Sequence, residues 1–169
     1  MITTVAAADW IKRIAEDERS RDAARVRDAE GVARKADLVR RHGPRLVDEL
    51  RTTMTRDLDA FRSEFPGDAA RDVGIDLLGP DGGFVVRRLA PAAVSLSVTP
   101  SLDTALVVCL YGFTLAGSLP SREDQVTLMF VCDGDETVRL KNQATRQVFT
   151  TADALSEFLL VPVLTARRR

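Results

Sequence analysis

The stretch that decides the fold is Gly43–Phe65, GPRLVDELRTTMTRDLDAFRSEF. Its large apolar side chains recur at spacings of three and four residues, the period that puts side chains on one stripe of an α-helix. They are Leu46, Val47, Leu50, Met54, Leu58, Phe61 and Phe65. We therefore expect an amphipathic helix over residues 44–65, with its stripe packed against the rest of the protein.

Both ends of this helix carry residues that interrupt helices. Pro44 suits a first helical position, because the amide it lacks would be unpaired there anyway, and Gly43 suits the end of a preceding helix. Pro66 disfavours helical geometry at the residue before it, and Gly67 permits a turn. The pattern predicts either two helices or one kinked helix, ending near residue 66.

Beyond residue 66 the apolar period becomes that of β-strands. The segment AVSLSV, residues 93–98, alternates between apolar residues and serine, as on a strand with one face in water. The runs ALVVCLYGFTL, 105–115, and QVTLMFVC, 125–132, are apolar on both faces, so they are expected at the centre of a sheet.

Two short turn motifs indicate how the strands connect. DGD at 133–135 and PDGG at 80–83 both lie between apolar runs, and Asp-Gly pairs favour tight hairpins because they tolerate positive φ. Connections this short leave no room for crossover helices, so the strands of residues 72–149 should pair antiparallel.

The two cysteines, Cys109 and Cys132, fall in the two central runs. If these strands pair about a turn centred on Pro120 and Ser121, Cys109 faces Cys132. Adjacent buried thiols are more often packing groups than a redox switch. Free thiols in apolar strands suit a reducing compartment, so we expect a cytoplasmic protein.

The C-terminal segment has the features of one more helix. Thr150 and Asp153 have the spacing of a capping box, and Pro162 is expected to end the helix, which gives the range 151–161. The apolar residues between them repeat with helical spacing: Ala154, Leu155, Phe158 and Leu159.

These elements define an α+β fold. We expect an N-terminal long helix or helical hairpin packed on a curved antiparallel sheet of five to seven strands, with a C-terminal helix. The expected organisation is a charged helical arm, 1–43, followed by an α+β domain, 44–169.

The arm combines a mixed-charge run, EDERSRDAARVRDAE at 16–30, with a thin apolar stripe. Exposed ion pairs on a helix contribute only about 0.2–0.5 kcal/mol each to its stability, so the charges alone do not stabilise the helix of the arm. We therefore expect either a helical hairpin or self-association through the stripe. The alternative is that residues 16–25 are merely the solvated bridge of a long helix. The candidate interaction surface is Trp10, Ile14, Val26, Val32 and Val39.

The sequence contains no convincing catalytic or metal-binding motif. The single histidine, His42, lies beside a helix break without a nucleophile-elbow pattern elsewhere. Two cysteines and one histidine at long spacings do not make a zinc site, and CDGDE at 132–136 lacks the length of an EF-hand loop. GPDGG at 79–83 lacks the lysine of a P-loop. We assign no catalytic residues, metal or cofactor.

The charge and the hydropathy of the chain limit the classes of partner that we expect it to bind. The chain has 24 Lys and Arg against 25 Asp and Glu, a formal net charge of -1, and acidic residues separate the arginines of the arm, so nucleic-acid binding is not favoured. No apolar run reaches the roughly 18 residues of a membrane helix.

We therefore expect a non-enzymatic protein-interaction module that oligomerises through its arm. A small-ligand-binding domain or an enzyme, with a pocket between the long helix and the curved sheet, is the alternative.

Overall fold

A computed structural model describes residues 5–89, 93–114 and 121–167. The chain divides into two compact units, residues 1–37 and 38–169. Helix α1, Val5–Ser63, forms the first unit and continues into the second. The long-helix alternative is therefore confirmed, and the helical hairpin is not formed.

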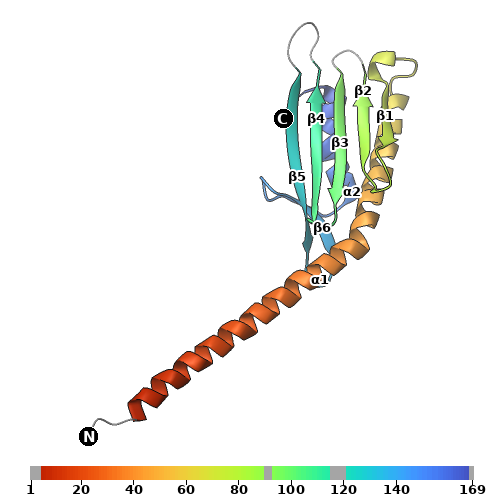
Figure 1. The fold of residues 1–169 in the computed structure, drawn as a ribbon. Coiled ribbons are helices and arrows are strands. Elements are labelled where there is room, and N and C mark those ends of the chain that lie inside the picture. Colours follow the sequence, from red (N-terminus) through yellow and green to blue (C-terminus); the bar gives the residue numbers. More distant parts are fainter. Residues whose placement is uncertain (1–4, 90–92, 115–120, 168–169) are drawn as a thin grey trace. The chain divides into compact units, whose positions relative to one another are not determined.

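The second unit contains a seven-stranded antiparallel sheet in which each strand pairs with the next along the chain (Figure 1). The strands are β1 Val73–Leu77, β2 Phe84–Arg88, β3 Val94–Ser101, β4 Leu106–Phe113, β5 Arg122–Cys132, β6 Val138–Asn142 and β7 Val148–Phe149. A short 3₁₀ helix, Ala69–Arg71, precedes β1, and helix α2, Ala152–Thr165, follows β7. The predicted α+β class, the antiparallel sheet and both hairpin turns are confirmed.

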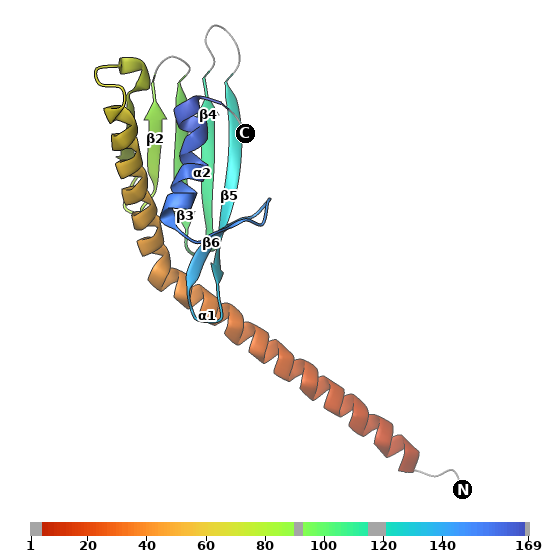
Figure 2. The same ribbon diagram turned by 180° about the vertical axis from the view of Figure 1, so that it is seen from behind.

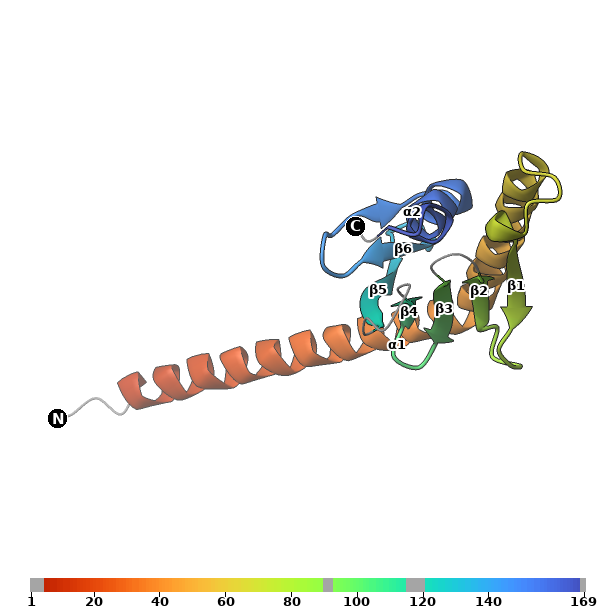
Figure 3. The ribbon, with the colours of Figure 1, turned by 90° about the horizontal axis from the view of Figure 1, so that it is seen from above.

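The sheet is curled, and helices cover its concave face. Figure 3 shows the strands following an arc with α2 inside it, and Figure 2 shows α2 and the later part of α1 on the same side of the sheet. On α1, four residues of the predicted stripe are in the core, with Val47, Leu50, Met54 and Leu58 each no more than 3% exposed. Burying one such side chain stabilises the fold by about 1.5–3 kcal/mol, so this stripe is a major source of stability. Leu46 and Phe61 are half-buried, and Phe65, which was predicted to end the stripe, lies beyond the helix and is 37% exposed.

The helix passes through Gly43 and Pro44 without a break. A Cβ atom at Gly43 would lie 2.7 Å from Cδ2 of Leu102 and 3.5 Å from the ring of Phe130. Gly43 therefore allows the helix to approach the sheet closely, and it does not end a helix as the sequence pattern suggested. The helix ends at Ser63, and Gly67, with φ of 74°, turns the chain towards β1.

The two faces of the sheet differ in burial. On β3, Val94, Leu96 and Val98 point into the core, whereas the serines between them are half-buried. The predicted central positions of β4 and β5 are confirmed by the strand order. The outward-facing side of β4 is only partly covered, however: the side chain of Leu110 is 44% exposed.

The pairing of β4 with β5 differs from the predicted register. Cys109 lies opposite Val126, and Cys132 pairs across the next ladder with Val138. The predicted pairing of the two cysteines is therefore wrong. Both strands are apolar over long stretches, so several registers bury a similar set of side chains, and the apolar pattern alone does not select one.

Helix α2 begins one residue after its predicted start and extends past its predicted end. Its N-cap is Thr151, and not Thr150 as the predicted capping box required; the Thr151 hydroxyl accepts a hydrogen bond from the amide of Ala154 at 3.2 Å. Pro162 is buried inside the helix, which continues to Thr165. Two hydrogen bonds from the sheet hold the C-terminal half of α2: Tyr111 donates to the carbonyl of Leu159 at 2.7 Å, and Arg88 donates to the carbonyl of Leu164.

The boundary between the two units lies at Asp37 and Leu38, ahead of the predicted boundary at residue 43. Leu38 and Val39 belong to the core of the second unit, at 4% and 0% exposure. Within the described part of the chain, no helix is both long enough and apolar enough to cross a membrane.

Candidate interaction surface

The first unit is a helix that buries none of its described side chains. From Ala8 to Asp37 every residue is exposed except for the half-buried Ala15, Ala24, Lys35 and Ala36. A helix stabilised only by its own backbone and exposed ion pairs is marginal in water, because most helix stability in proteins comes from packing an apolar face. The first unit therefore presents an apolar stripe that its own described residues do not bury.

Four of the five candidate residues lie on this open surface. Trp10 is 49% exposed, Ile14 51%, Val26 57% and Val32 71%. Ile11, which was not among the candidates, is 54% exposed, and its spacing of three from Ile14 was the signal that could have identified it. These side chains are available to a partner.

The fifth candidate, Val39, is not available. It is completely buried in the core of the second unit, with Leu38 beside it. The prediction that Val39 belongs to an interaction surface is therefore corrected. The sequence pattern continued the stripe across residue 37 because helical spacing alone does not show where a sheet begins to cover it.

The two units carry apolar stripes of the same helical spacing. With 3.6 residues per turn, Ile11, Ile14 and Val32 share one face in the first unit, and Val47, Leu50 and Met54 share one face in the second. The stripe of the second unit is buried, whereas Ile11, Ile14 and Val32 are each more than half exposed. The same kind of apolar face is therefore covered in one unit and left open in the other.

Four charged residues occupy the middle of the open stripe: Glu18, Arg21, Asp22 and Arg25. Arg21 binds Glu18 at 2.8 Å and Arg25 binds Asp22 at 3.3 Å, both between side chains that are more than half exposed. Exposed pairs of this kind contribute little to stability. They keep the segment electrically neutral, so it presents no one-signed patch.

Two of the grooves in the second unit lie beside α1. One, of about 600 Å³, lies between α1, β6 and the start of α2, and its polar lining includes Glu49, Thr53, Arg56 and Arg139. The other, of about 880 Å³, lies between α1 and the β1–β2 and β3–β4 turns, beside Arg51. Between the two helices and the sheet, large side chains such as Met54 and Phe130 fill the core.

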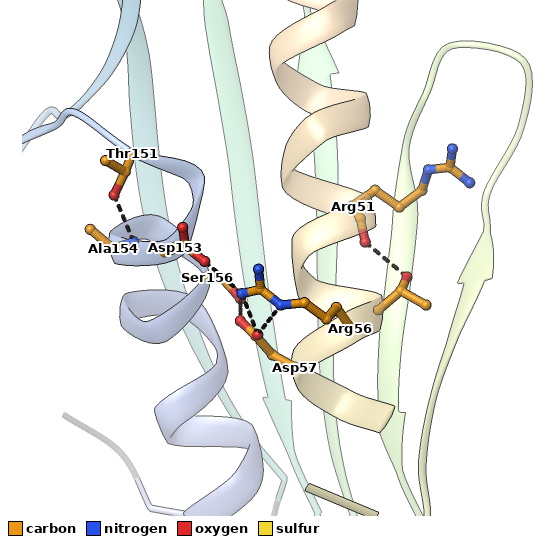
Figure 4. A network of polar contacts seen from close by, with 8 residues as sticks. Arg51, Arg56, Asp57, Thr151, Asp153, Ala154 and Ser156 are labelled. Carbon is orange, nitrogen blue, oxygen red and sulfur yellow. Dashed lines mark hydrogen bonds and ion pairs between the residues drawn. The ribbon is translucent and has the colours of Figure 1, made fainter. Parts of the chain in front are cut away.

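Polar contacts at the first groove join the two helices (Figure 4). The Arg56 guanidinium donates to Asp57 at 2.7 Å and to Asp153 at 2.5 Å, and the Ser156 hydroxyl donates to Asp57 at 2.7 Å. Hydrogen bonds to Asp153 and Asp57 raise the pKa of Arg56. This network connects α1 to α2 through groups that satisfy one another.

The remaining side chains that could take part in catalysis or bind a metal are not arranged as a reactive centre. Burial raises the pKa of the Cys109 thiol to about 12, so this sulfur is a neutral packing group at physiological pH. His42 is exposed. Among the described residues, no three His, Cys, Asp or Glu side chains gather where they could hold a metal ion.

No family model, curated protein or solved structure matches this chain.

Proposed function

We propose that this protein is a non-enzymatic interaction module that associates with itself through the helix of its first unit. The observation that carries the proposal is the exposure of Ile11, Ile14 and Val32 on one face of the helix, an apolar stripe with the same spacing as the one that is buried in the second unit. Apolar stripes on helices are buried against other elements in folded proteins, and an exposed one indicates an interaction surface.

A second copy of the same helix is a suitable partner for this stripe. Its narrow apolar surface, flanked by charges of both signs, matches what helices bury against each other in pairs and bundles. Nucleic acid remains a poor partner for the same surface, because the phosphate backbone requires a one-signed basic patch.

We also propose a cytoplasmic location. It is supported by Cys109 and Cys132, which lie on neighbouring strands but at different heights of the sheet and are not joined by a disulfide. Cysteines that form no disulfide are typical of proteins in reducing compartments.

The mass of the full chain in solution tests the self-association. Light scattering coupled to size-exclusion chromatography should give a mass above that of one 18.5 kDa chain, in a concentration-dependent manner. Ile14→Asp should shift the protein towards the monomer, because it places a charge where the pair would exclude water. The matched control is Ser20→Asp, which adds the same charge on the other side of the helix and should leave the mass unchanged. A monomeric wild-type chain at all concentrations would contradict the proposal.

The groove of about 600 Å³ supports a second candidate, a small-ligand-binding function. Its volume lies within the range of small-molecule sites, and Thr53 lies on its wall. Native mass spectrometry of the purified chain should then show a bound small molecule that Thr53→Trp removes by filling the groove. A wild-type chain that carries no ligand in this measurement counts against this candidate.

A further inference from the structure

We infer that the first unit pairs with a second copy of itself in an antiparallel arrangement, with a two-fold axis between Arg21 and Asp22. The inference deepens the proposed self-association and depends on it. It follows from the order of charges and side-chain sizes along the exposed stripe of α1.

The four charges in the middle of the stripe alternate in sign. From the N-terminal end they are Glu18, Arg21, Asp22 and Arg25. Read in the opposite direction, every sign is reversed. Two copies that run antiparallel about the proposed axis therefore place Glu18 opposite Arg25 and Arg21 opposite Asp22. Two parallel copies in register would instead place every charge opposite a charge of the same sign.

Within one chain these charges have little stabilising value. The pairs Arg21–Glu18 and Arg25–Asp22 are exposed, and the neighbours four residues apart, Glu18 with Asp22 and Arg21 with Arg25, repel each other. Across the antiparallel pair the same residues become complementary. Charge complementarity of this kind chiefly fixes register and excludes wrong pairings, and it adds less to raw affinity.

The apolar residues fit the same register. On one side of the charged segment the stripe carries the large side chains Ile11 and Ile14, and on the other side Ala29 and Val32. The proposed axis places Ile14 opposite Ala29 and Ile11 opposite Val32. Large side chains thus meet smaller ones, which lets two helices approach closely and fill the space between them.

The same axis also keeps the pairing within the first unit. Trp10, at the edge of the stripe, comes opposite Ala33, and these contacts lie before Leu38, where the stripe enters the core of the second unit. The pairing therefore uses the exposed part of the stripe and leaves the buried part in place.

Cysteine cross-linking in the full chain tests the direction of the pair. Two variants, Ile14→Cys and Ala29→Cys, are prepared in a Cys132→Ser background, with the buried Cys109 retained. In the antiparallel pair neither variant cross-links to itself, because its two sulfurs lie far apart, at about 1.5 Å per residue along the helix. A mixture of the two variants should form a disulfide-linked dimer.

Each outcome of this experiment is informative. Cross-linking of Ile14→Cys with itself would place the two copies of residue 14 side by side and overturn the proposed register, while the proposed self-association would survive. A monomeric chain that forms no cross-link in any mixture would overturn both. Circular dichroism of each variant checks that the helix is retained.

A charge exchange provides an independent test. Glu18→Arg should raise the dimer Kd by about tenfold or more, because it places two arginines opposite each other at both symmetric sites. The double variant Glu18→Arg/Arg25→Glu should restore the wild-type Kd. Glu16→Arg, on the other side of the helix, is the control and should leave the Kd within about twofold. In a parallel pair Glu18→Arg exchanges one like pair for another, so an unchanged Kd would contradict the antiparallel register.

Discussion

At the scale of single residues, Gly43 shows how a position can serve a different purpose from the one its type suggests. Glycine next to proline is typical of a helix boundary, yet here it lies inside a continuous helix. Its missing side chain leaves room for Leu102 and Phe130, whose atoms would be within 3.5 Å of a Cβ atom. The close contact between helix and sheet is the reason for glycine at this position.

Replacing Gly43 should therefore destabilise the protein. Gly43→Val should lower the free energy of unfolding by about 1–3 kcal/mol, the cost of overpacking a filled core. Urea denaturation followed by circular dichroism measures this change.

The matched control is Gly31→Val, at a helical glycine with no heavy atom within 4 Å of the added Cβ. It should change the free energy of unfolding by less than about 0.5 kcal/mol. Equal effects of the two substitutions would show that helix propensity decides the outcome at Gly43, and that packing does not.

At the scale of elements, α1 and α2 are joined by two kinds of polar contact, a hydrogen bond from a buried hydroxyl and an exposed ion pair. Ser156 is 0% exposed and donates to Asp57, while Arg56 joins Asp153 on the surface with both side chains more than 60% exposed (Figure 4). A buried hydrogen bond to a carboxylate is worth more than a solvated ion pair.

Substitutions in this network should differ accordingly. Ser156→Ala should lower the free energy of unfolding by about 1.5–3 kcal/mol, because Asp57 loses a buried donor. Asp153→Asn should lower the free energy of unfolding by less than about 1 kcal/mol. Thermal and urea denaturation of both variants provide the comparison, and a larger loss for Asp153→Asn would mean that the surface pair is the stronger link.

At the scale of the whole molecule, the two units are stabilised differently. Residues 38–169 enclose one continuous core, whereas the described side chains of the first unit have no buried packing. Local stability follows the number of buried apolar contacts, so the helix of the first unit should open more readily than the later part of α1.

Hydrogen exchange should show this difference and its dependence on self-association. In dilute protein, the amides of residues 8–37 should exchange faster than those of residues 46–63, and their protection should rise with protein concentration as pairs form. Protection of residues 46–63 is the internal control and should stay constant. Protection of the first unit that is high and independent of concentration would contradict the proposal that it needs a partner.

Local patterns in the sequence were enough to predict most of the architecture. The spacing of Val47, Leu50 and Met54 predicted an amphipathic helix. Alternation predicted β3 and continuous apolar runs predicted β4 and β5, and the turns at 80–83 and 133–135 predicted antiparallel hairpins. Each of these features depends on neighbours a few residues apart, whose relative positions the backbone period determines.

Only the tertiary structure decided the features that depend on distant partners. Val39 is buried, Gly43 lies within a helix and Pro162 lies within α2 because of contacts with the sheet or its turns. The register of β4 and β5, which separates Cys109 from Cys132, was likewise set by the whole core. The physical reason is that several local arrangements bury similar amounts of apolar surface, and only close packing among residues far apart in the sequence distinguishes them.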